Sequence, residues 1–132
     1  MAAMLPLRHP WFWLLPGWVL VVAVIAASVF PGIAITALNI PSADKLAHAA
    51  SYCLLMIWFA GLYAPRHHGI VALSLLALGL VLELIQWSLP YRFFEPADLL
   101  ANAIGVMVGL VLSISLLAGW CQRMETRLGY HD

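Results

Sequence analysis

The chain has 132 residues, of which 64% are hydrophobic and only 9% are charged, and its mean hydropathy is +0.98. This composition lies far outside the range of soluble globular proteins and indicates a membrane protein. The formal net charge is zero and the six basic residues are scattered along the chain, which argues against nucleic acid as a partner.

Four apolar runs each approach the roughly 20 residues needed to cross a hydrocarbon core of about 30 Å. They cover about residues 11–30, 45–63, 70–89 and 98–120. The first run also resembles the apolar core of a signal peptide, but its length favours an uncleaved span. The connections are too short for a soluble domain, so residues 1–132 are predicted to form a single all-α membrane bundle of four helices.

The connections carry turn and helix-start signals. Residues 31–43 contain two Pro-centred turns, and either Ser42 or Asp44 is a suitable N-cap for the second helix. Residues 64–69 form a tight basic turn, and Pro96 suits the first position of the fourth helix.

Basic residues predict the orientation of the bundle. If the four spans alternate, one side of the membrane holds both termini and the 64–69 turn, and it carries more basic residues than the other side. The positive-inside rule therefore places both termini in the cytoplasm. The basic residues on the two sides are Arg8, Arg66, Arg123 and Arg127 against Lys45 and Arg92.

In this topology, polar side chains of three spans meet on the outward side of the membrane. Asp44 and His48 are four residues apart, as are Asp98 and Asn102, so each pair lies on one helix face. Ionisable groups inside a membrane are costly and usually functional. We therefore predict an outward-opening pocket whose ligand-binding residues are Asp44, Lys45, His48, Glu83, Gln86, Arg92, Asp98 and Asn102.

Small residues on the fourth span predict close helix packing. Gly105 and Gly109 form a Gly-x-x-x-Gly pair that allows another helix to approach closely. Packing within the bundle is the preferred interpretation, and the pair alone does not indicate a homo-oligomer.

The polar pattern resembles that of the VanZ-like membrane protein family over about residues 44–109. The motifs are Asp44-Lys-x-x-His48-x-x-x-Tyr52-x-x-Leu55, Glu83-x-x-Gln86 with Pro90-x-Arg92, and Asp98-x-x-x-Asn102-x-x-Gly105-x-x-x-Gly109. The one departure is Pro96-Ala97 before Asp98, where a small polar residue is expected.

The family is named for a protein associated with resistance to the glycopeptide teicoplanin. The resemblance implies a multi-pass protein of the bacterial inner membrane with a polar site near the outer leaflet. It implies no cofactor and no particular substrate.

Several functions remain open for this site. Lys45 and Arg92 could hold the phosphate or carboxylate of an anionic lipid or a lipid-linked cell-envelope precursor, which is the preferred hypothesis. Alternatively, the polar residues form a purely structural clamp between helices. An enzyme acting on a lipid headgroup would use His48, Glu83 and Asp98 as general acids and bases, but no serine stands in a nucleophile motif.

Two further hypotheses have less support from the sequence. A metal site built from the same three side chains would have one histidine and no fixed ligand spacing, so no metal is predicted. A proton-coupled transporter would need a polar path to the inner side, and the four short spans carry none.

Overall fold

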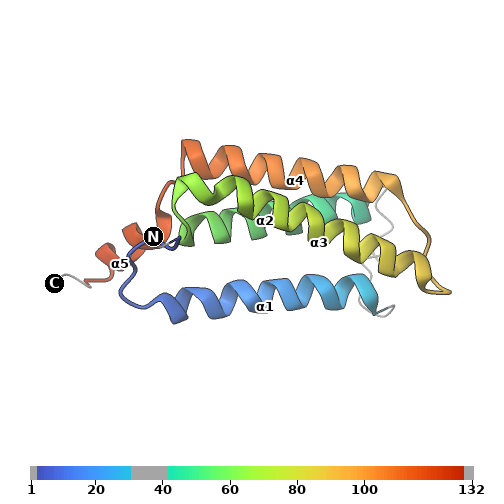
Figure 1. Ribbon diagram of the computed structural model, residues 1–132, viewed down its shortest axis with the longest axis horizontal. Coiled ribbons are helices and arrows are strands. Elements are labelled where there is room, and N and C mark those ends of the chain that lie inside the picture. The colour runs from blue at the N-terminus through green and yellow to red at the C-terminus, as the bar shows by residue number, and fades with distance from the viewer. Residues whose placement is uncertain (1–2, 31–41, 130–132) are drawn as a thin grey trace.

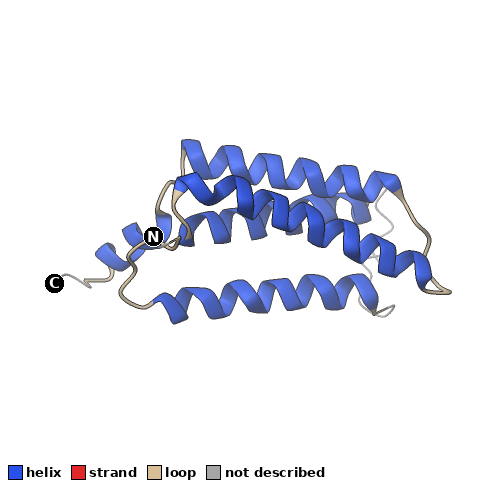
Figure 2. Cartoon of the chain, in the orientation of Figure 1, coloured by secondary structure: helices blue, strands red, loops and turns tan. Residues whose placement is uncertain are grey.

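The computed structural model describes residues 3–30 and 42–129, and within these ranges the chain is entirely helical apart from loops and one isolated bridge (Figure 1, Figure 2). Four of the helices are long and apolar enough to cross a membrane, which confirms the predicted all-α architecture. The helices are α1 (Pro10–Val29), α2 (Ala43–Leu62), η3 (Pro65–His67), α3 (His68–Ser88), α4 (Pro96–Ser115) and α5 (Trp120–Arg127).

The helix ends follow the local sequence. Pro96 occupies the first turn of α4, where its missing N–H has no intrahelical partner to lose. Ser42 precedes α2 as expected, but its hydroxyl makes no capping hydrogen bond and its φ is 62°. The Pro-centred turns predicted in residues 31–41 lie outside the described residues.

The fourth apolar run ends earlier than predicted. α4 stops at Ser115 and not at residue 120, and Gly119 then adopts a left-handed conformation with φ 61° before the short helix α5. Glycine adopts this conformation without the steric cost of a Cβ atom. The tail from residue 121, which the sequence shows as polar and at best amphipathic, thus lies partly in a short helix whose Glu125 contacts the start of α1.

α2 is the central helix, and its most extensive partner is α4. The two backbones come close at the small residues of α4: a Cβ atom added to Gly105 would lie 2.2 Å from the backbone oxygen of Ala49. At Gly109 the corresponding distance to the backbone oxygen of Cys53 would be 2.7 Å. Both glycines thus lie against α2 of the same chain.

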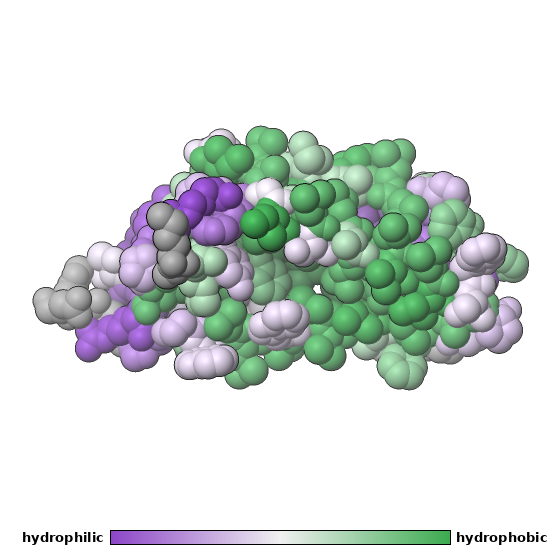
Figure 3. Space-filling view, viewed as in Figure 1, coloured by the Kyte–Doolittle hydropathy of each residue, from purple (hydrophilic) through white to green (hydrophobic). Residues whose placement is uncertain are grey.

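α1 lies along one side of this pair and packs mainly against α2 and α3 (Figure 1). The outer surface of the bundle is apolar between two more polar ends, as expected for helices facing lipid (Figure 3). We call the end with the starts of α1 and α3 and with α5 the terminal end. The opposite end, where α3 connects to α4 through residues 89–95, is the distal end.

Candidate functional site

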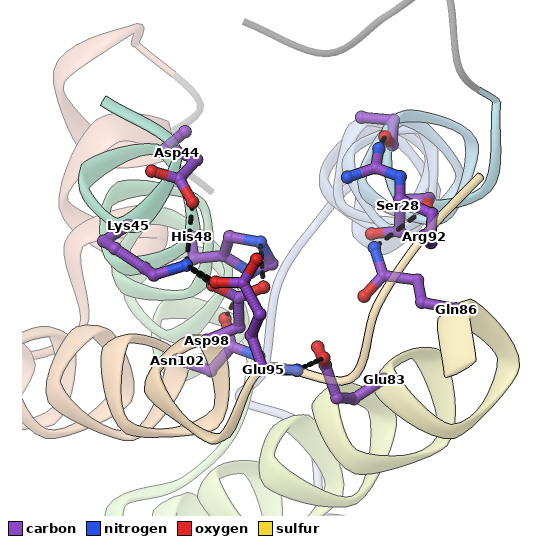
Figure 4. A network of polar contacts seen from close by, with 12 residues as sticks. Ser28, Asp44, Lys45, His48, Glu83, Gln86, Arg92, Glu95, Asp98 and Asn102 are labelled. Atoms are coloured by element: carbon purple, nitrogen blue, oxygen red, sulfur yellow. Dashed lines mark hydrogen bonds and ion pairs between the residues drawn. The ribbon is translucent and has the colours of Figure 1, made fainter. Parts of the chain in front are cut away.

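The ammonium group of Lys45 lies at the centre of a carboxylate cluster at the distal end (Figure 4). Lys45 Nζ donates to Asp44 Oδ2 at 2.7 Å, to Asp98 Oδ1 at 2.5 Å and to a carboxylate oxygen of Glu95. Oxygen atoms of the three carboxylates lie within 4.8 Å of one another, close enough to share one cation. Lys45 supplies that positive charge, so its three donors are already engaged.

His48, about one helical turn after Lys45 in α2, connects α2 to α4 through side-chain contacts. Its Nδ1 donates to Asn102 Oδ1 at 2.9 Å, because an amide oxygen only accepts hydrogen bonds. The other ring nitrogen, Nε2, lies 3.6 Å from Asp98 Oδ2 and forms an ion pair with it when the ring is protonated. Gly79 of α3 makes room for this arrangement, since a Cβ atom there would lie 2.8 Å from Asn102 Nδ2.

Glu83 is the most deeply buried ionisable side chain at this end, with 1% of its surface exposed. Its Oε1 accepts a hydrogen bond from the backbone N–H of Glu95 at 2.7 Å, which fixes the loop just before α4. Glu83 therefore positions the residue that contributes a carboxylate to Lys45. The sequence analysis did not include Glu95 in the site, because Glu95 lies in a loop where helical spacing gives no prediction. Its position directly before Pro96, the expected first residue of a helix, could have indicated it.

Gln86 and Arg92 do not join the Lys45 cluster. Gln86 Nε2 donates to the Ser28 carbonyl at 2.9 Å, and Arg92 donates to the Ala27 carbonyl at 3.4 Å. Tyr91 adds a hydrogen bond to the Val29 carbonyl at 2.8 Å. These carbonyls belong to the last turn of α1, which has no further helical N–H groups to bond them. Figure 4 shows the two groups apart, with Glu83 between them in this view.

The distal end carries a surplus of carboxylates. The formal charges of its ionisable residues other than histidine sum to −2; they are Asp44, Glu83, Glu95 and Asp98 against Lys45 and Arg92. Asp44 and Glu95 are solvent-exposed while Glu83, Asp98 and Asn102 are buried, so the cluster reaches the surface on one side. A proton, a metal ion or a donor-rich ligand can balance such a surplus.

Two serines, Ser51 of α2 and Ser88 of α3, show no activating partner among the described contacts. Ser51 Oγ donates to the Ala47 carbonyl at 2.7 Å, and Ser88 Oγ donates to the Ile85 carbonyl at 2.6 Å. Both hydroxyls are thus bonded to the backbone of their own helix. The distal end consequently offers the carboxylate acceptors and the His48 imidazole of the Lys45 cluster and, apart from them, the Arg92 guanidinium. These groups suit binding and proton transfer.

The fold and this polar end define a multi-pass helical membrane protein with ionisable groups gathered at one membrane depth. The model of the VanZ/LLP1 family matches residues 4–118, and the chain belongs to that family. No curated protein and no solved structure shows significant similarity to it.

Proposed function

We propose that the distal end binds the phosphate-bearing headgroup of a membrane lipid or of a lipid-linked cell-envelope precursor in the outer leaflet of the bacterial inner membrane. The carboxylate surplus carries this proposal. A structural clamp needs only the buried partners of Lys45, whereas Asp44 and Glu95 add two solvent-exposed carboxylates with more acceptor sites than the three donors of Lys45 can use. A bound headgroup that donates hydrogen bonds to Asp44, Glu95 and Asp98 would account for the excess acceptors.

The contacts support different roles for Lys45 and Arg92. Because Lys45 is engaged by three carboxylates, we do not propose it as the phosphate ligand. Among the described residues, Arg92 makes one long side-chain hydrogen bond, at 3.4 Å, and its guanidinium has five N–H donors. Arg92 is therefore the proposed phosphate ligand, and hydroxyl or amine groups of the headgroup would face the acidic cluster.

Native mass spectrometry of gently solubilised protein tests this proposal, with wild type beside Arg92→Ala and Glu83→Gln. We expect wild type to retain a defined phosphate-bearing lipid and Arg92→Ala to lose it by about tenfold or more, since a charge-assisted hydrogen bond contributes about 1.5–3 kcal/mol. Glu83→Gln keeps an oxygen for the Glu95 N–H and should weaken retention less.

The matched control is Arg127→Ala, which removes one exposed arginine from the terminal end. It should leave lipid retention at the distal end unchanged. If Arg92→Ala retains every lipid that wild type retains, the headgroup proposal fails. If no sample retains a specific lipid and both distal variants unfold at lower temperature, the polar residues act as a structural clamp.

A further inference from the structure

A separate groove lies between α1, α2 and α3 in the half of the bundle nearer the terminal end. Its volume is about 510 Å³, and its walls are almost entirely aliphatic and aromatic. Figure 3 shows this apolar face hollowed between α1 and α3. The residues that line it include Trp18, Phe59, His67, Val71, Ser74 and Leu75.

The shape of the groove suits one hydrocarbon chain. Along α3 it extends from Ile70 to Leu78, which at 1.5 Å per residue is about 12 Å. One leaflet of a hydrocarbon core of about 30 Å is about 15 Å thick. The length of the groove is therefore close to the depth of a single leaflet. Its lining residues on α3 belong to a candidate membrane span.

One of the residues that line the groove has a polar atom without a hydrogen-bond partner among the described residues. His67 lines the groove, and its Nδ1 is buried with no hydrogen-bond partner among the described residues. Buried polar atoms are normally hydrogen-bonded, so this one calls for a partner. The hydroxyl of Ser74, which also lines the groove, is bonded to the Ile70 carbonyl at 2.8 Å and does not supply that partner.

Charge at the terminal end favours an anionic partner. Among the described residues outside the long helices at this end, the arginines outnumber the single carboxylate of Glu125. Basic residues near a membrane surface attract anionic lipids. The arginines are Arg8, Arg66, Arg123 and Arg127.

We propose that this groove binds one acyl chain of an anionic phospholipid and that His67 hydrogen-bonds the lipid phosphate. The site is independent of the headgroup site at the distal end, which lies at the opposite end of the bundle and involves other residues. It would make an anionic lipid of the leaflet at the terminal end an integral part of the packing between α1 and α3.

Blocking the groove tests the proposal. Ser74→Trp fills the groove from an exposed position on α3, whereas Leu73→Trp places the same side chain on an exposed position that does not line it. Purified protein is mixed with phosphatidylglycerol or with phosphatidylcholine of the same chains, and native mass spectrometry measures the bound fraction. Wild type and Leu73→Trp should prefer phosphatidylglycerol, and Ser74→Trp should lose roughly tenfold of its binding.

Two further variants separate this site from the distal one. His67→Phe keeps an aromatic ring without the polar atom and should lose the preference for phosphatidylglycerol. The same variants are also measured in an Arg92→Ala background, which removes the proposed phosphate ligand of the distal site, so that the remaining bound phosphatidylglycerol reports the groove. The proposal is overturned if Ser74→Trp binds as much phosphatidylglycerol as Leu73→Trp, or if wild type binds both lipids equally.

Discussion

At Gly105 a single methyl group would meet the backbone of the neighbouring helix. Its Cβ atom would lie 2.2 Å from the Ala49 oxygen, and backbone cannot rotate aside as a flexible side chain can. We expect Gly105→Ala to push α2 and α4 apart and to lower the free energy of unfolding by about 1–3 kcal/mol, the usual cost of overpacking. Reversible unfolding in mixed detergent micelles measures this change.

Gly69 provides the matched control. It lies in the first turn of α3, and a Cβ atom there would have nothing within 4 Å. Because alanine favours a helix over glycine by up to about 1 kcal/mol, Gly69→Ala should leave stability unchanged or raise it slightly. Equal destabilisation by the two substitutions would show that the close approach at Gly105 does not limit stability.

The polar residues of the helices could be anticipated individually, but their pairing could not. Spacing of four residues correctly placed Asp44 with His48, and Asp98 with Asn102, on one face each. Spacing does not predict where the Glu95 side chain lies, because Glu95 is in a loop and helical periodicity does not apply to it. It also does not show that Lys45 is engaged by three carboxylates, since that depends on how α2 and α4 pack.

At the scale of elements, α1 is held at both ends by side chains from other parts of the chain. Gln86, Tyr91 and Arg92 bond its last carbonyls. At the terminal end, buried Glu125 of α5 accepts hydrogen bonds from the backbone N–H groups of Arg8 and His9 and from the indole of Trp13, at 2.9, 3.1 and 2.9 Å. α5 thus anchors the start of α1.

Replacing Glu125 by Gln should loosen this anchor. Burial raises the pKa of the Glu125 carboxyl, but the hydrogen bonds from Arg8, Trp13 and His9 outweigh burial and leave the pKa below its ordinary value. A carboxylate with a lowered pKa stabilises the folded state above its ordinary pKa of about 4.5, and this stabilisation is lost as the pH falls through the lowered value. We expect Glu125→Gln to cost about 1–3 kcal/mol at neutral pH.

The pH dependence distinguishes this anchor from general packing. The difference in unfolding free energy between wild type and Glu125→Gln should be constant above about pH 5 and shrink toward zero in acid. Arg127→Gln, in the same helix and exposed, should show no such pH-dependent difference. A difference between wild type and Glu125→Gln that does not change with pH would assign the loss to packing.

α5 was not predictable for a physical reason. Residues 116–118 are as apolar as α4, so hydropathy continues past the true helix end at Ser115. Gly119 alone marks the break, and an isolated glycine is tolerated within membrane helices. The four spans were predictable because each is a long apolar run, and their observed bounds differ from the predicted ones mainly at this end.

At the scale of the whole molecule, the four long helices place both ends of the described chain on one side of the membrane and the 89–95 loop on the other. A cysteine scan can test which side is cytoplasmic. Cys121 is fully buried, and burial together with the nearby Glu125 carboxylate raises its thiol pKa to about 12, so it should not react with a maleimide at neutral pH. The other cysteine, Cys53, lies within the membrane-spanning helix α2, away from the water that carries an impermeant reagent. Wild-type protein therefore measures the background labelling.

The positive-inside rule predicts the outcome of that scan. In right-side-out membrane vesicles, a membrane-impermeant maleimide should label Phe93→Cys, which is 82% exposed in the distal loop. It should label Gly69→Cys, at the start of α3, only after the vesicles are opened. This result would place the carboxylate cluster in the outer leaflet, where the proposed headgroup site requires it. The reverse pattern would place the cluster in the inner leaflet and exclude a ligand confined to the outer leaflet.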